Sequence, residues 1–391
     1  MYLYEEMTYK QFLNELIGKL NQEKSYDRIF SSMCTPPLEV LREIASEFAE
    51  INLGDPGLFP ESVKLEREVL EEYANILHAP NTWTGSITSG GSESNLIGCW
   101  AARNWGWKKK NIKNGKIIFP KSAHVSFEKA SDILAIKSDW IDLDEDFRVN
   151  IESVKNSIDH ETVGLVGIAG TTGTGVSDDI IALSDLAIDH NLYLHVDAAH
   201  GGMIYPFLVE LDYPSHQFDF LLEGVSSITI DSHKILGSII PGGNILFRSN
   251  EYSEAIEKTI SYLSNSSTKQ MTITGTRPGN ATLCAWVLLK KLGRSYIIER
   301  VKYCLDLTKY FVEQLKQIPK IDLVFEPTIN IIGFKNSVMS TKDLMAKLRE
   351  FGWKVSIFSD WARIVVMPHI TKPNIDLFIN DLENILNDKK E

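Results

Sequence analysis

Short apolar runs alternate with helical patterns through most of this chain. Three strand-like runs each precede a stretch with helical periodicity, and a fourth run follows them. The pairs are 83–88 with 92–105, 116–120 with 126–134, and 163–170 with 178–189, followed by the run 192–197. Alternation of this kind is typical of βαβ units. It predicts an α/β fold with a mainly parallel sheet covered by helices on both faces.

The two ends of the chain have different patterns. Phe12, Leu13, Leu16 and Leu20 recur at helical spacing, so residues 1–50 are expected to form a helical arm. Beyond about residue 285 one long helical stretch precedes two further strand-like runs and more helix. We therefore expect a large α/β domain over 51–285 and a small α+β domain over 286–391.

Composition narrows the function classes. The net charge of −12 argues against a nucleic-acid or anionic-membrane binder, because both need a basic face. Four cysteines stand without the spacing of a zinc site or a disulfide framework, namely Cys34, Cys99, Cys284 and Cys304. The first residues lack a basic-then-apolar signal pattern, and no apolar stretch is long enough to span a bilayer. We expect a cytoplasmic protein without a metal site.

Chemistry-bearing residues stand where the predicted strands end, which is where ligands collect in open α/β sheets. Gly91 and Ser92 follow the first strand and open a helix, an arrangement suited to a phosphate. Asp197 ends the run 192–197, and a carboxylate there is costly unless it is paired. Lys234 follows the strand-like run in "SITIDSHKILG" (227–237).

Two further strand exits add a histidine in 124–130 and hydroxyl groups in 169–179. None of the five exits is specific alone. Together they fit one ligand that has a phosphate, an aromatic ring, a basic ring nitrogen and an aldehyde. Pyridoxal phosphate has all four.

Five motifs occur here in the order found in the pyridoxal-phosphate-dependent group II amino-acid decarboxylases. They are "SGGSESN" (89–95), "HVSFEKA" (124–130), "HVDAAHGG" (195–202), "SHK" (232–234) and "GTRPG" (275–279). The chain most resembles the archaeal tyrosine/aspartate decarboxylase branch, because of "NLGDPGLFP" (52–60) and "RIVVMPHIT" (363–371). The resemblance implies the fold type I, aspartate-aminotransferase-like architecture, with a seven-stranded, mainly parallel sheet.

The resemblance also implies roles for the cofactor-binding residues. Lys234 matches the lysine that forms a Schiff base with pyridoxal phosphate, and Asp197 matches the carboxylate that keeps the pyridine nitrogen protonated. His124 would stack on the ring, and in this family the matching residue is also discussed as an acid or base. Ala199 would pack on the opposite face. The remaining cofactor contacts implied are Gly91, Ser92, Thr172, Ser232 and His233.

Three residues are implied for substrate binding, proton transfer and the dimer. Arg363 matches the arginine that binds the substrate α-carboxylate. Tyr262 matches, loosely, the loop tyrosine that protonates Cα. Family members are homodimers whose sites take residues from both chains, so Thr276 would reach the neighbour's phosphate.

The implied reaction is α-decarboxylation of an L-amino acid. Aspartate and tyrosine are the favoured substrates, and glutamate stays open. One alternative is carbon–carbon cleavage of the sphingosine-1-phosphate lyase type, which shares several motifs. Another is an inactive scaffold homologue, which predicts loss of the lysine or the aspartate, whereas Lys234 and Asp197 are both present.

Overall fold

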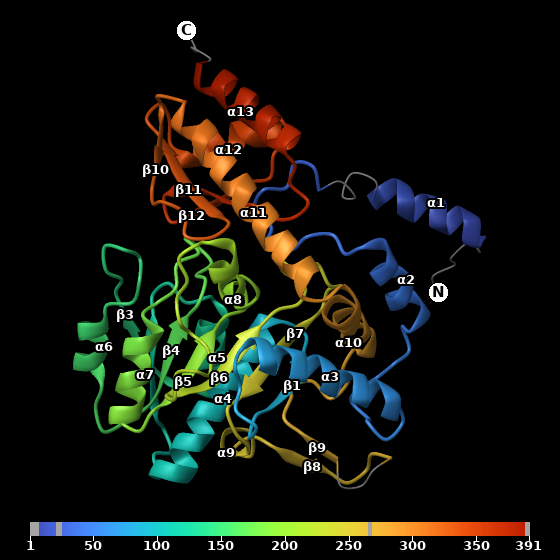
Figure 1. Cartoon of the computed structure of the whole chain (residues 1–391), viewed down its shortest axis with the longest axis vertical. Coiled ribbons are helices and arrows are strands. Elements are labelled where there is room, and N and C mark those ends of the chain that lie inside the picture. The colour runs from blue at the N-terminus through green and yellow to red at the C-terminus, as the bar shows by residue number, and fades with distance from the viewer. Residues whose placement is uncertain (1–7, 21–25, 265–267, 388–391) are drawn as a thin grey trace, which may run out of the picture.

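The computed structural model describes residues 8–20, 26–264 and 268–387. A large α/β unit carries a smaller unit built from the C-terminal part of the chain, and the long helix α11 runs from one to the other (Figure 1). The seven-stranded, mainly parallel sheet with helices and the small C-terminal sheet, both predicted from the sequence, are confirmed. The predicted domain limits near residues 50 and 285 stay a prediction.

The large sheet has the strand order β1-β7-β6-β5-β4-β2-β3. Its strands are β1 (Thr84–Thr88), β2 (Lys116–Pro120), β3 (Lys137–Ile141), β4 (Thr162–Ile168), β5 (Tyr193–Asp197), β6 (Val225–Ile230) and β7 (Gly243–Phe247). The five strands from β6 to β3 run parallel, whereas β7 is antiparallel to both of its neighbours. The carboxyl ends of β4, β5 and β6 therefore meet at one edge of the sheet.

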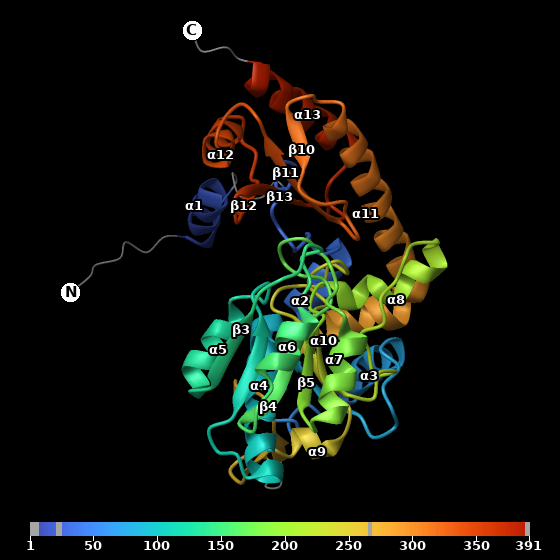
Figure 2. The same cartoon turned by 90° about the vertical axis from the view of Figure 1, so that its left-hand side faces the viewer.

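Helices cover both faces of this sheet. The helices of the large unit are α3 (Pro60–Ile76), α4 (Gly91–Lys110), α5 (Ser126–Leu134), α6 (Ile151–Ser157), α7 (Ile180–Asp189), α8 (Tyr205–Leu208), α9 (Asn250–Ser253) and α10 (Gly279–Trp286). Neighbouring residues of β4 face opposite sides: Val166 packs in the core beneath α4 and α5, and Leu165 packs in the core beneath α7. The turned view separates the two layers (Figure 2). Burial of β4 on both faces explains its almost uninterrupted apolar sequence.

The smaller unit is a four-stranded antiparallel sheet in the order β10-β11-β13-β12. Its elements are β10 (Ile321–Leu323), β11 (Ile331–Asn336), β12 (Ser356–Phe358), β13 (Trp361–Val365), α11 (Gly293–Lys316), α12 (Thr341–Glu350) and α13 (Lys372–Asn387). A residue from the N-terminal part of the chain completes the core of this smaller unit. The buried Phe30 contacts the rings of Phe311, Trp353 and Phe378. The segment around Phe30 thus ties the start of the chain to its end.

Three elements stand away from these cores. The helix α1 (Tyr9–Leu20) stands apart at the level of the smaller unit, and the hairpin β8 (Lys258–Ile260) with β9 (Thr268–Gln270) projects from the large unit (Figures 1 and 2). The helix α2 (Glu39–Glu47), by contrast, packs against α10. Within the described ranges, no helix has the length and apolar character that crossing a membrane requires.

Candidate active site

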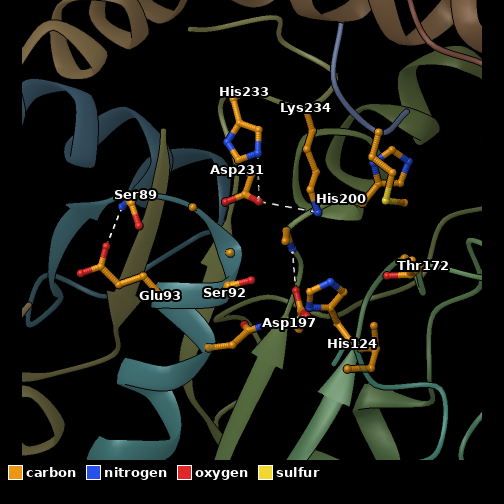
Figure 3. Close-up of a pocket in the computed structure, with 17 residues that line it drawn as sticks. Ser89, Ser92, Glu93, His124, Thr172, Asp197, His200, Asp231, His233 and Lys234 are labelled. Atoms are coloured by element: carbon orange, nitrogen blue, oxygen red, sulfur yellow. Dashed lines mark hydrogen bonds and ion pairs between the residues drawn. The ribbon is translucent and has the colours of Figure 1, made fainter. Parts of the chain in front are cut away.

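A cavity of about 360 Å³ lies where β4, β5 and β6 end and where α4 begins (Figure 3). Eight residues singled out from the sequence line it: Gly91, Ser92, His124, Thr172, Asp197, Ala199, His233 and Lys234. Among the other lining residues are Met33, Glu93, Asn95, His200 and Asp231. Residues from six separate parts of the sequence thus converge on one site.

Asp197 is fixed at the floor of the cavity. It is the last residue of β5, and its side chain is buried. Oδ2 accepts a hydrogen bond of 2.8 Å from Nδ2 of Asn95, and Oδ1 accepts one of 3.0 Å from the backbone N–H of Ala199. Asn95 is held in turn by His195, whose Nε2 lies 3.2 Å from Oδ1 of Asn95. These neutral donors orient the carboxylate and leave its charge uncompensated, so Asp197 can pair with a cationic ring nitrogen.

The N-terminus of α4 opens onto the same cavity. The first N–H groups of a helix have no partner within it and attract anions. Gly90 precedes the helix with φ of 148°, a conformation that favours glycine. A Cβ at Gly91 would come within 2.9 Å of Oδ2 of Asp231 and 3.0 Å of Cβ of Ala199. Glycine at this position therefore keeps the helix terminus accessible.

Glu93, in the first turn of α4, is buried and shapes this entrance. Its Oε2 accepts a hydrogen bond of 2.7 Å from the backbone N–H of Ser89. Its Oε1 accepts bonds of 3.3 Å from the N–H and hydroxyl of Thr274. The carboxylate therefore ties the loop before α4 to the segment that leads to α10.

His124 lies over the cavity in front of α5. The backbone N–H of Ser126 donates to Nδ1 of His124 over 3.2 Å, which places the ring proton on Nε2. Burial lowers the pKa of His124 below its ordinary 6.5. The negative charge of Asp197 raises this pKa, but its effect is smaller than that of burial. A neutral imidazole held in this way is suited to stack on an aromatic ring.

Lys234 reaches into the centre of the cavity from the loop after β6 (Figure 3). Its Nζ lies 3.6 Å from Oδ2 of Asp231, and Nε2 of His233 lies 3.9 Å from the same oxygen. Burial opposes a charge on His233, but a hydrogen bond with Cys34 and the negative Asp231 outweigh it and raise the His233 pKa to about 9. His233 is therefore positively charged at neutral pH.

His200 also lines the cavity, across Lys234 from Ser92 in the view of Figure 3. It is 2% exposed, and its Nε2 lies 2.9 Å from Oδ1 of Asn330, at the start of the small unit. Burial, with the positive charges of Lys234 and Arg363, lowers the His200 pKa to about 3. The ring is therefore neutral at physiological pH.

Arg363, on β13, lies behind the wall of the cavity and is not among its lining residues. Its guanidinium donates to the backbone oxygens of Thr172 at 2.7 Å and Ser31 at 2.8 Å, and to Oγ of Ser356 at 3.1 Å. All three acceptors are neutral, although the side chain is buried. A buried cation that has no ion pair within the described part of the chain has the electrostatic character of an anion-binding group.

Three residues singled out from the sequence lie elsewhere. The hydroxyl of Ser232 donates to the backbone oxygen of Gly242 over 3.2 Å and does not line the cavity. Tyr262 is 85% exposed in the turn that follows β8, and Thr276 is exposed before α10. One chain alone therefore does not bring Tyr262 or Thr276 to its own cavity.

Two residues that line the cavity, Asp231 and Asn95, were not predicted as site residues, although the sequence contains a signal for each. Asp231 directly follows the buried strand β6, just as Asp197 ends β5, so the same argument about buried carboxylates applies to it. Asn95 lies four residues after Gly91 on the helix opened by that glycine, and therefore on the same helix face.

The lining residues fit pyridoxal phosphate. The cavity volume suits a small cofactor. The α4 N-terminus suits its phosphate, Asp197 its ring nitrogen, and His124 and Ala199 the two faces of its ring. Among the described residues, the amine of Lys234 has a single polar contact, the long one of 3.6 Å with Asp231, so it is available to bond an aldehyde.

Comparison with known proteins identifies the same chemistry. Residues 43–337 match the pyridoxal-dependent decarboxylase conserved domain. The chain is 42% identical to the L-aspartate/L-glutamate decarboxylase of Pyrococcus horikoshii, over 96% of this chain and 97% of that protein. It is 41% identical to a probable L-tyrosine/L-aspartate decarboxylase of Methanothermobacter thermautotrophicus, over 92% and 97%.

The fold matches solved structures as well. The sphingosine-1-phosphate lyase of Burkholderia pseudomallei superposes with a TM-score of 0.90 at 25% identity, covering 98% of this chain and 91% of the lyase chain. The decarboxylase resemblance noted from the sequence motifs is confirmed by the domain match and by the archaeal relatives, which cover nearly the whole chain.

Proposed function

Because this chain belongs to the pyridoxal-dependent decarboxylase family, and is thus a carboxy-lyase that uses pyridoxal phosphate, we propose that it removes the α-carboxylate of L-aspartate. The observation that carries the proposal is the placement of Lys234 and Asp197 in one cavity with the α4 N-terminus. The archaeal relatives described above support aspartate. L-Tyrosine and L-glutamate remain the other candidates.

The cavity residues supply binding and orientation. When bound, pyridoxal phosphate supplies an aldehyde that bonds an amine and a ring that withdraws electrons from Cα. Asp197 would hold a proton at the ring nitrogen, and the α4 N-terminus with Ser92 would hold the phosphate. His124 and Ala199 would enclose the ring, and Lys234 would hold the aldehyde until substrate replaces it.

Arg363 would select the bond that breaks. A guanidinium binds a carboxylate through two parallel hydrogen bonds and so fixes its direction. Binding there requires Arg363 to exchange its bond with the Thr172 carbonyl for the substrate. Holding the α-carboxylate would orient the breaking bond relative to the ring, which is the main contribution that positioning makes to catalysis.

We further propose a homodimer with shared sites in the cytoplasm. One face of α1 leaves five apolar side chains 36–54% exposed, namely Phe12, Leu13, Leu16, Ile17 and Leu20. Such a face is suited to a protein interface. Dimerisation would also bring the projecting Tyr262 to a neighbouring site, where its phenol would return a proton to Cα.

The four cysteines are free thiols, as expected in a reducing compartment such as the cytoplasm.

The experiment is to incubate the holoenzyme with single L-amino acids and to measure carbon dioxide and the amine product. The proposal predicts β-alanine from aspartate, with slower or absent release from tyrosine and glutamate. Release from tyrosine alone would reassign the substrate. No release from any amino acid would overturn decarboxylation.

Carbon–carbon cleavage is a second candidate because of the close superposition with a sphingosine-1-phosphate lyase. The higher identity to decarboxylases argues against it. Supplying a phosphorylated long-chain base and assaying for a long-chain aldehyde decides between the two. Aldehyde release without carbon dioxide from amino acids would favour the lyase.

A further inference from the structure

One buried ring nitrogen in the cavity wall has no partner. The Nδ2 of Asn330 donates to the backbone oxygen of Val366 over 3.0 Å, so its Oδ1 is the atom that faces His200. Nε2 of His200 must therefore carry the proton in that 2.9 Å hydrogen bond. Nδ1 is then a bare acceptor, and it has no hydrogen-bond partner among the described residues.

An unpaired buried acceptor costs about 1–3 kcal/mol, so such a group points to a ligand. In the view of Figure 3, His200 lines the cavity on the opposite side of Lys234 from the proposed phosphate site at Ser92. The part of the cavity that remains for a substrate side chain therefore includes the His200 ring.

We propose that His200 is a specificity-determining residue that binds the side-chain carboxylate of an acidic substrate through a proton taken up at Nδ1. This rests on the proposed function, because it names the group that recognises the aspartate side chain. The imidazolium donates from Nε2 to Asn330 and from Nδ1 to the carboxylate. One proton enters from solvent for each acidic ligand bound, and no covalent bond changes.

The charges around His200 make this proton uptake depend on the ligand. Lys234 on the loop after β6 and Arg363 on β13 are the cations that disfavour a second positive charge on the ring. The carboxylates that line the cavity are Glu93, Asp197 and Asp231. An aspartate substrate neutralises Arg363 with one carboxylate and brings a second negative charge to His200. The charges around the ring then favour its protonated form. A neutral side chain brings no such charge.

The test compares two ligands of nearly equal shape on the holoenzyme. Succinate has two carboxylates, whereas succinamate replaces one with an amide that donates directly to a bare Nδ1. Uptake of one proton makes succinate affinity fall about tenfold per pH unit between about pH 6 and about pH 8. The affinity for succinamate should not change with pH in this way. Protein groups whose titration affects both ligands equally cancel when the two pH profiles are compared. Equal pH dependence of the two ligands would overturn the proposal.

Variants give a second, independent readout. H200N keeps a polar group but cannot take up the proton, so its succinate affinity should lose the pH dependence and its kcat/KM for aspartate should fall about 10- to 100-fold. His216 contacts Tyr205 outside the cavity, and H216N is the matched control with wild-type pH dependence. A wild-type pH profile in H200N would contradict the assignment.

The two proposals fail in different ways. Carbon dioxide release from aspartate, with succinate binding that is independent of pH, would reject the role of His200 and keep the decarboxylase assignment. Proton-linked succinate binding without carbon dioxide release would keep the acidic-ligand site and reject aspartate decarboxylation.

Discussion

The carboxylate of Asp231 lies 3.6 Å from Nζ of Lys234, and both residues belong to the loop after β6. Asp231 is 2% exposed, and its Oδ1 has no hydrogen-bond partner among the described residues. Oδ2 also faces His233 at 3.9 Å. One buried anion therefore holds two cationic side chains at the cavity, next to the helix terminus that suits a phosphate.

Replacing Asp231 by asparagine removes this anion and keeps its shape. The negative charge of Asp231 is one of the causes that raise the His233 pKa to about 9, so D231N should lower that pKa by about one unit. His233 then loses its proton at a lower pH than in the wild type. NMR titration of the His233 ring measures this directly.

The control is D219N, because Asp219 is also buried and faces a histidine, His78, but does not line the cavity. D219N should leave the His233 titration unchanged. An unshifted His233 in D231N would mean that Asp231 does not govern the charge at this loop.

Gly91→Ala tests the helix terminus as the phosphate site. The added Cβ would lie 2.9 Å from Asp231 and 3.0 Å from Ala199, so the α4 entrance must shift. We expect affinity for pyridoxal phosphate to fall at least about tenfold, while affinity for pyridoxal, which lacks the phosphate, changes little. Absorbance titration of the apoprotein with each aldehyde gives both values. An equal loss for the two aldehydes would place the phosphate elsewhere.

Arg363→Lys should damage substrate binding and spare the cofactor. Lysine cannot form two parallel hydrogen bonds with a carboxylate, so kcat/KM should fall about 100-fold, mainly through KM. Cofactor affinity should change less than KM, because Arg363 is not itself one of the proposed cofactor contacts and reaches them only through the backbone oxygen of Thr172. Steady-state kinetics and cofactor titration on one preparation separate the two effects.

Arg248 offers a matched control. It is partly buried and, like Arg363, donates to backbone oxygens, in this case those of Phe220, Val225 and Leu222, away from the cavity. R248K should therefore cost some stability but leave KM near the wild-type value. A similar rise of KM in both variants would mean that Arg363 acts only through the fold.

Tyr262→Phe tests the shared site. Tyr262 is 85% exposed, so the variant should fold and bind cofactor normally, yet lose turnover. If Tyr262 acts on the neighbouring chain, mixed dimers of Y262F and K234A contain one intact site each. Random mixing of the two inactive variants should then restore about a quarter of wild-type activity.

Mixing D197N with K234A is the control for that experiment. Asp197 and Lys234 line the cavity of one chain, so no hybrid contains an intact pair, and no activity should return. Absence of recovery with Y262F as well would show that Tyr262 does not act across a dimer.

The large sheet was predictable because its signal is local. Apolar runs such as 163–170 and 192–197 are bounded by glycine or polar residues, and each strand exit presents its chemistry within a few residues. Asp197 and Lys234 follow this rule, so reading strand exits finds both. The order of the family motifs along the chain then indicates which role each of these strand ends has in the site.

The rest depends on contacts between distant segments. Asn330 forms a hydrogen bond with His200, 130 positions away, and Arg363 donates one to the backbone oxygen of Ser31, 332 positions away. No local sequence pattern predicts either pair. Phe30 likewise lies in a segment expected to be part of a helical arm, yet it packs in the core of the C-terminal unit. Such contacts follow from how the two units pack.

Lys234 is the residue expected to bond the cofactor in this cavity. Reduction of the holoenzyme with borohydride, followed by peptide mass mapping, tests it most directly. We expect one pyridoxyl group, carried by Lys234, and a colourless, inactive protein for K234A. A label on another lysine, or a yellow and active K234A, would contradict it.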